Sequence, residues 1–188
     1  FTLTRELARQ TRPGGPATLE AIREVLGEQR AAGRQVETPV AQLLSSTEKY
    51  DHVIEELNIP SEREIHIPAW VTRPAAPPRN KRPAVLALAD AGKDGFVAEG
   101  GLASEFARAG YVFLTADVRG RGQCVPRPPS NGPRYYAGRG EDFYVWDTLV
   151  LGRPLLGGYV HDALQAARAL LARPDVDASR AWILAQGA

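Results

Sequence analysis

The most constraining feature of this sequence is a pair of short apolar segments, 84–89 and 111–116, separated by an amphipathic stretch. Each segment has the length and uniform apolarity of a strand that is buried on both faces of a parallel sheet. Between them, 97–109 carries apolar residues at helical spacing, and Gly110 then follows as a typical residue at a helix C-terminus. Strand, helix and strand at these lengths predict a parallel βαβ unit and therefore an α/β fold.

Two further segments extend this pattern toward the C-terminus. Residues 158–172 form a predicted helix, and 181–185 form a predicted third parallel strand. The apolar positions of the helix that we expect to face the sheet are Val160, Ala163, Leu164, Ala167, Leu170 and Leu171. We therefore expect a mostly parallel sheet with helices on both faces.

The segment that precedes the first apolar run follows a period of two. Apolar and polar residues alternate in 53–57 and again in 65–71, with a turn near Pro60 between them. This pattern predicts an antiparallel hairpin at the edge of the sheet. The proline-rich stretch 74–83 is expected to be an exposed loop.

The first 49 residues are expected to lie outside the main domain. Breaker residues around Pro13 indicate an irregular arm, and Thr18 is placed to cap an amphipathic helix that packs against the main body. We therefore divide the chain into a linker arm with one helix, 1–49, and a domain, 50–188. Because the sequence starts at Phe1 and contains no Met, we expect a processed or excised piece of a longer polypeptide.

Composition argues against several functional classes. The 23 Lys and Arg residues nearly balance the 22 Asp and Glu residues, so no strong field attracts nucleic acid or an anionic membrane surface. The single cysteine, Cys124, permits no internal disulfide. No apolar run approaches the roughly 20 residues that span a bilayer. We expect no nucleic-acid partner, no membrane span, no metal site and no cofactor.

One segment with a specific pattern follows the second apolar run. The stretch Asp117-Val-Arg-Gly-Arg-Gly122 resembles the Asp-x-Arg-Gly-x-Gly loop that follows a strand in α/β-hydrolases. Its glycines allow a tight backbone path, and Asp117 and Arg119 can brace that path by pairing or hydrogen bonding. In the family this loop is structural, so neither residue is expected to be catalytic.

A second block resembles one branch of that superfamily more closely. Segment 151–157, together with 173–180, resembles the acetyl xylan esterase branch of the carboxylic-ester hydrolases. There it leads into the nucleophile elbow, Gly-x-Ser-x-Gly. The resemblance covers about 55–188. It implies the N-terminal part of an α/β-hydrolase fold, truncated at the nucleophile elbow.

The resemblance also implies a defect at the catalytic position. Counting from Arg180, the first elbow glycine falls on Ala185 and the nucleophile falls on Gly187, which has no hydroxyl to attack an ester. After strand 84–89 the family usually places His-Gly, whose backbone helps to build the oxyanion hole. Asp90 stands in this loop here, and its carboxylate would repel a developing oxyanion.

Other reactive side chains are expected to be structural. In this fold the acidic and histidine members of the triad follow the elbow, whereas His52, His66 and His161 precede it. Cys124 is the alternative nucleophile that we considered, but it occupies the structural loop. The adjacent Glu141 and Asp142 point apart in a strand or loop and are expected to be solvated. An aromatic and basic loop is expected to pack on a partner domain or to bind carbohydrate: Arg127, Arg134, Tyr135, Tyr136, Arg139, Phe143, Tyr144 and Trp146.

Two functional hypotheses follow. The first is an acetyl xylan esterase-like domain without its Ser, which acts as an accessory or scaffolding half of a larger hydrolase. The second is an active acetyl ester hydrolase whose Ser lies just beyond Ala188 or in a companion domain. Both imply a missing C-terminal half or companion hydrolase domain as partner and a carbohydrate ester as candidate substrate, and the resemblance favours a secreted or periplasmic location. A nucleotide-binding domain is disfavoured because 90–95 lacks the required glycine spacing.

Overall fold

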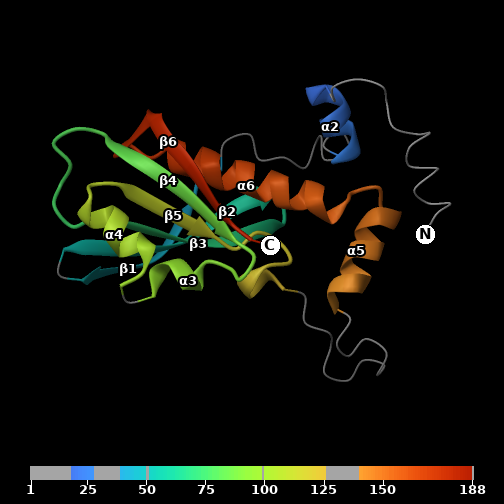
Figure 1. The fold of residues 1–188 in the computed structure, drawn as a ribbon, viewed down its shortest axis with the longest axis horizontal. Helices are drawn as coiled ribbons and strands as arrows, with labels where there is room; N and C mark the ends of the chain where they lie inside the picture. The colour runs from blue at the N-terminus through green and yellow to red at the C-terminus, as the bar shows by residue number, and fades with distance from the viewer. Residues whose placement is uncertain (1–17, 28–38, 50, 99, 126–139, 188) are drawn as a thin grey trace.

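The computed structural model describes residues 18–27, 39–49, 51–98, 100–125 and 140–187. At its centre is a six-stranded sheet with the order β1-β2-β3-β5-β4-β6 (Figure 1). The strands are β1 (Gln42–Lys49), β2 (His52–Glu62), β3 (Ile65–Pro74), β4 (Arg82–Ala89), β5 (Val112–Ala116) and β6 (Val176–Gln186). The helices are α2 (Leu19–Val25), α3 (Asp94–Val97), α4 (Leu102–Arg108), α5 (Gly140–Val150) and α6 (Leu155–Leu171), with a 3-10 turn, η2 (Gly122–Cys124).

The parallel part of the sheet confirms the predicted strands. β4 pairs in parallel with β5 on one side and with β6 on the other. The middle of β4 and all of β5 are buried, because neighbouring strands and helices on both faces enclose them. This arrangement places the carboxyl ends of β4, β5 and β6 at one edge of the sheet, where open α/β sheets bind their ligands.

The antiparallel part of the sheet is larger than predicted. β2 and β3 form the expected hairpin, but β3 also pairs with β5, and β1 lies outside β2. The hairpin was therefore predicted correctly, but its predicted position at the edge of the sheet was wrong, because β1 forms that edge. β1 escaped prediction because all eight of its residues are exposed, and such a strand shows no apolar alternation. The sheet begins at Gln42 rather than after Tyr50.

Helices cover both faces of the sheet, as predicted. On one face α6 packs over a core that includes Ile59, Ile67 and Leu114. On the other face α3 and α4 pack over a core that contains Phe96 and Phe113, whose rings meet edge to face at 5.8 Å. The two cores fix the sheet between helical layers.

The helix predicted at 97–109 is divided in the structure. α3 ends at Val97 and α4 starts at Leu102, with Gly100 and Gly101 between them. Gly100 has a φ of +73°, which other residues adopt only with strain. A side chain at Gly101 would collide with the Phe96 carbonyl oxygen at 2.6 Å. These two glycines separate the helices.

The predicted inner face of α6 is confirmed only in part. Leu170 is buried and Ala167 packs against the core, but Leu164 and Leu171 are exposed at 44% and 39%, and the buried face also carries His161, Asp162 and Gln165. The helix turns its polar residues inward because they bond to partners on β2 and on the loop after β5.

The N-terminal helix α2 begins directly after Thr18, as its predicted role as the N-cap requires. The Thr18 hydroxyl accepts a hydrogen bond from the Ala21 N–H at 3.2 Å. The apolar side chains of α2 are nevertheless exposed, contrary to the expected packing against the body. Contact is made instead by the end of the helix, where the Leu26 carbonyl lies directly against Gly157 at the start of α6.

Candidate functional site at the carboxyl edge of the sheet

The structure brings together the two positions that the sequence analysis had singled out separately. In the β4–β6 ladder Ala89 is opposite Gln186, so Asp90 and Gly187 are the first residues beyond paired strand ends. The Asp90 N–H donates to the Gln186 carbonyl oxygen at 3.1 Å. A Cβ atom at Gly187 would lie 2.7 Å from Asp90 Oδ2. The Asp90 carboxylate therefore lies against the space that a nucleophile side chain at position 187 would need.

Two open hollows flank this point. One, of about 530 Å³, lies on the side of the loop after β4 and is lined by residues that include Gly92, Phe96 and Gln186. The other, of about 340 Å³, lies on the side of α6 and includes Arg121, Tyr159 and Val160. Asp90 and Gly187 line both hollows, which makes this edge the candidate functional site.

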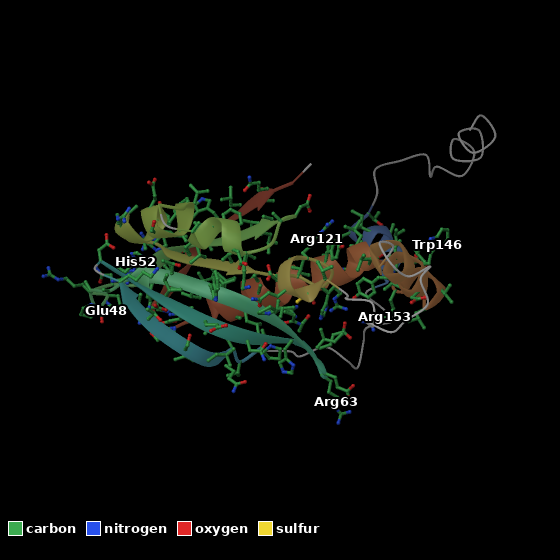
Figure 2. All side chains as sticks on the ribbon, turned by 90° about the horizontal axis from the view of Figure 1, so that it is seen from below. Glu48, His52, Arg63, Arg121, Trp146 and Arg153 are labelled. Atoms are coloured by element: carbon green, nitrogen blue, oxygen red, sulfur yellow. The ribbon has the colours of Figure 1, made fainter. Side chains whose placement is uncertain are left out.

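Arg121 also lies at this edge, although no sequence pattern had indicated it. Its Nη2 lies 3.6 Å from Asp90 Oδ1, and its guanidinium lies over the Tyr159 ring at 5.3 Å. The Asp90 side chain is 57% exposed, so solvent screens this ion pair and its energetic contribution is small. Arg121 and Trp146 lie at the same end of the molecule, away from Glu48 and His52 (Figure 2).

Asp117 braces the two loops that form this edge. Its buried carboxylate accepts hydrogen bonds from the Lys93 N–H at 2.6 Å, the Lys93 ammonium at 3.0 Å and the Gln123 N–H at 3.0 Å. Lys93 is itself buried and also lies over the Trp70 ring at 4.7 Å. One carboxylate thus ties the loop after β4 to the loop after β5, as the structural interpretation of Asp117 expected.

Arg119 braces the same loop through different partners. It donates to both Asp162 oxygens, at 2.9 and 2.6 Å, and to Glu62 Oε1 at 2.8 Å. Arg153 donates to the same Glu62 oxygen at 2.5 Å. Burial raises the pKa of Glu62, but hydrogen bonds from the two arginines outweigh it and bring the pKa below its usual value. This buried network joins β2, the loop after β5 and α6.

Cys124 is a poor nucleophile in this setting. Burial, followed by the negative charges of Asp117 and Asp162, raises the pKa of its thiol to about 11. The thiol donates to the Asp117 carbonyl oxygen at 3.4 Å. The thiol is therefore protonated at neutral pH, which supports its structural interpretation.

Two of the described histidines have partners away from Asp90 and Gly187. His52 pairs with Asp51 at 2.7 Å, and His161 is buried with its Nε2 3.0 Å from the Ser61 carbonyl oxygen. Glu141 and Asp142 belong to helix α5 rather than to a strand or loop. Most of the predicted aromatic and basic loop lies outside the described residues, while Tyr144 and Trp146 belong to α5.

The described residues contain no cluster of three or more His, Cys, Asp or Glu side chains placed to hold a metal ion. Within the same residues, no helix combines the length and apolarity needed to cross a membrane.

Comparison with known proteins gives matches only at the level of structure. No protein-family model and no curated protein sequence matches the chain. A Bacteroides fragilis structure assigned as an acetyl xylan esterase matches 97% of this chain and 53% of its own, with a TM-score of 0.69 and 15% identity. Acetyl xylan esterases from a Paenibacillus and a Thermoanaerobacterium species match 96% and 91% of this chain, with TM-scores of 0.62 and 0.53 and identities of 17% and 18%.

The chain spans about half the length of these structures, since it covers 53%, 55% and 56% of their chains. At such identities the likeness concerns the fold. The strand order, the helices on both faces and these matches together confirm the predicted fold. The chain has the α/β-hydrolase fold, and Asp90 and Gly187 follow the carboxyl ends of two of its parallel strands, where open α/β sheets bind their ligands.

Proposed function

We propose that this chain is an acetyl xylan esterase-like hydrolase domain without its own Ser nucleophile and that it supports a larger hydrolase as an accessory half. The observation that carries this proposal is the position of Gly187, the first residue after β6 and level with Asp90 after β4. The nucleophile elbow stands at this level in the fold, where a strand turns into a helix. The register of the β4–β6 ladder supports the assignment of Gly187 to the nucleophile position.

The charge at this edge supports the same proposal. An oxyanion hole needs N–H donors aimed at the developing negative charge. Here the Asp90 N–H is already used by the Gln186 carbonyl oxygen, and the Asp90 carboxylate lies beside Gly187. A carboxylate at this distance disfavours an oxyanion by like-charge repulsion.

The proposed substrate class is based on the proteins with similar structures. Several proteins with the same fold are named as acetyl xylan esterases, and a glucuronoyl esterase matches 80% of this chain with a TM-score of 0.51. We propose a carbohydrate ester as the substrate of the larger hydrolase. The alternative is an active ester hydrolase whose Ser lies beyond Ala188 or in a companion domain, with Gly187 as the first glycine of the elbow.

Hydrolysis of a chromogenic acetyl ester tests the nucleophile assignment. We expect Gly187→Ala to leave any turnover by the intact polypeptide unchanged, because neither form has a hydroxyl at this position. The double variant Asp90→Gly/Gly187→Ser supplies a hydroxyl and removes the adjacent carboxylate, so any gain of turnover in it supports the register. A loss of turnover in Gly187→Ala would contradict the assignment, because it would make Gly187 part of a working elbow.

The accessory role is supported by apolar surface beside the site. On β6, Trp182 is 51% and Ile183 is 71% exposed, and on α6 Leu164 is 44% exposed. Within the described sheet β6 has a hydrogen-bonded neighbour only on the β4 side. An apolar strand with a free edge is an aggregation site unless another segment covers it. We propose that the C-terminal half or a companion hydrolase domain covers β6.

Hydroxyl-radical footprinting of the intact polypeptide tests this coverage. We expect Trp182 to be oxidised at least several-fold more slowly in the intact polypeptide than in a synthetic peptide of residues 176–187, because the covering segment excludes solvent from β6. Trp182 is 51% exposed in the described residues. A rate within about twofold of the rate in the peptide would contradict the proposed cover.

A further inference from the structure

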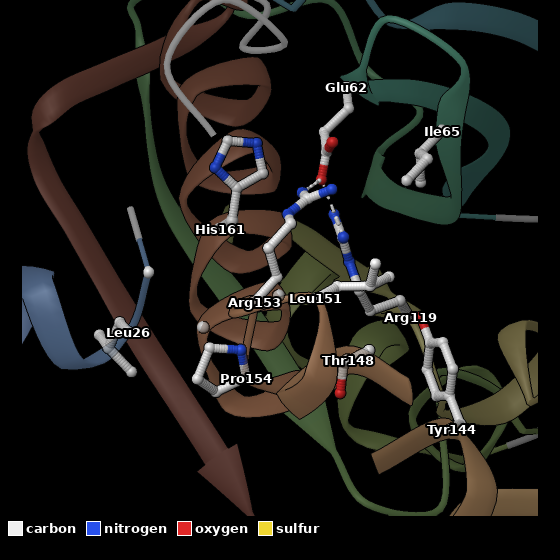
Figure 3. A pocket seen from close by; sticks show the side chains of 13 residues that line it. Leu26, Glu62, Ile65, Arg119, Tyr144, Thr148, Leu151, Arg153, Pro154 and His161 are labelled. Carbon is white, nitrogen blue, oxygen red and sulfur yellow. Dashed lines mark hydrogen bonds and ion pairs between the residues drawn. The ribbon is translucent and has the colours of Figure 1, made fainter. Parts of the chain in front are cut away.

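A second cavity lies away from the Asp90–Gly187 edge. It has a volume of about 190 Å³ and lies between α5, the start of α6, the β2–β3 turn and the end of α2 (Figure 3). Neither Asp90 nor Gly187 lines it. Its volume equals the share of about six water molecules in the liquid, so only a small molecule fits.

Two polar side chains that line this cavity carry hydrogen-bond donors with no partner among the described residues. Among the described residues, the only acceptor for the Arg153 guanidinium is Glu62, reached through Nη2 at 2.5 Å. The Nε and Nη1 donors are therefore available on a side chain that is 25% exposed. No described residue hydrogen-bonds to the Tyr144 hydroxyl, which is half-buried and turned toward Arg119 (Figure 3).

Apolar side chains also line the cavity. Leu26, Ile65, Leu151 and Pro154 offer no hydrogen bonds, and they lie around the polar groups on several sides. A ligand that satisfies both kinds of lining has acceptor oxygens at one end and a short hydrocarbon body. A guanidinium presents parallel N–H donors that match the two oxygens of a carboxylate.

We propose that this cavity binds a short-chain carboxylate of about two to four carbon atoms, with Arg153 as its anchor and the Tyr144 hydroxyl as a second donor. The charges favour a monoanion over a dianion. Glu62 lines the same cavity and pairs with both Arg119 and Arg153, while Asp162 also pairs with Arg119, so the charges of the two arginines and two carboxylates balance and only a single added negative charge is tolerated. A dianion such as hydrogen phosphate would be repelled more strongly by Glu62 and would leave the apolar lining uncovered.

Titration of the intact polypeptide with sodium acetate, propionate and butyrate tests the proposal, with binding followed by calorimetry and by the thermal unfolding midpoint. We expect saturable binding with a Kd on the order of a millimolar, as suits so small a ligand. Acetamide and inorganic phosphate should bind at least about tenfold more weakly, because one lacks the charge and the other lacks the hydrocarbon body.

Three variants separate the anchor from general effects. Arg153→Gln should weaken carboxylate binding about tenfold or more, because it removes a charge-assisted pair of hydrogen bonds. Tyr144→Phe keeps the ring and should weaken binding about threefold, and it serves as the test if Arg153→Gln does not fold. Arg108→Gln removes an exposed arginine that pairs with Asp51 and should leave binding unchanged. The proposal is overturned by absent saturation, by equal binding of acetamide or phosphate, or by wild-type affinity in both cavity variants.

Discussion

Replacing Asp162 by Ala is expected to lower the free energy of unfolding by about 3–5 kcal/mol, the cost of breaking a buried ion pair on one side. The Asp162 side chain is fully buried, and Arg119 donates three hydrogen bonds to its two oxygens, one of them from the backbone N–H. Ser61 also donates to it. In the variant, Glu62 is the remaining acidic partner of the buried Arg119, and Glu62 is also paired with Arg153.

Urea denaturation of the intact polypeptide, followed by circular dichroism, measures this effect. Asp51→Ala is the matched control, because Asp51 also pairs with an arginine, Arg108, but on the surface. We expect that control to leave the denaturation midpoint almost unchanged. A midpoint for Asp162→Ala close to that of the control would show that the buried network is dispensable.

The second large effect is expected at Gly122. Ala at this position should lower the free energy of unfolding by about 2–4 kcal/mol, the sum of overpacking and of a left-handed backbone. The Gly122 φ is +52°, and its Cβ would collide with the Asp117 carboxylate. That carboxylate has no room to move, because Lys93 and Gln123 bond to it from two loops.

Gly110→Ala separates the two causes. Gly110 has a φ of +89°, but an added Cβ would meet no atom within 4 Å, so this control carries the backbone strain alone. We expect it to cost about 1 kcal/mol in the same denaturation assay. If the two alanine variants unfold at the same urea concentration, Asp117 does not hold the loops as rigidly as its hydrogen bonds indicate.

Features with a local pattern could be predicted from the sequence. The buried strands around Leu86 and Leu114 and the cap at Thr18 each depend on a few consecutive residues. The inward face of α6 could be predicted only in part, because apolar periodicity placed Leu164 inside and His161 outside the expected stripe. His161 and Asp162 face inward and contact Ser61 and Arg119, which are far away in sequence, and such pairing leaves no periodic signal.

The candidate site could also be predicted only in part. The positions of Gly187 and Asp90 were predicted from the segments that resemble the family, and the structure places the two residues side by side. Their meeting depends on the β4–β6 register, which a sequence pattern does not contain. The Arg121 contact was missed because an arginine in a loop signals exposure, whereas its partner lies at the end of another strand.

Fluorophosphonate labelling of the intact polypeptide, read by peptide mass spectrometry, tests whether an activated serine stands at the end of β6. The reagent forms a covalent adduct with an activated serine and with no glycine. We expect no adduct in the peptide that contains Gly187 and the residues that follow it. An adduct on a serine within a few residues after Gly187 would overturn the proposed loss of the nucleophile, because it would make Gly187 the first glycine of an intact elbow.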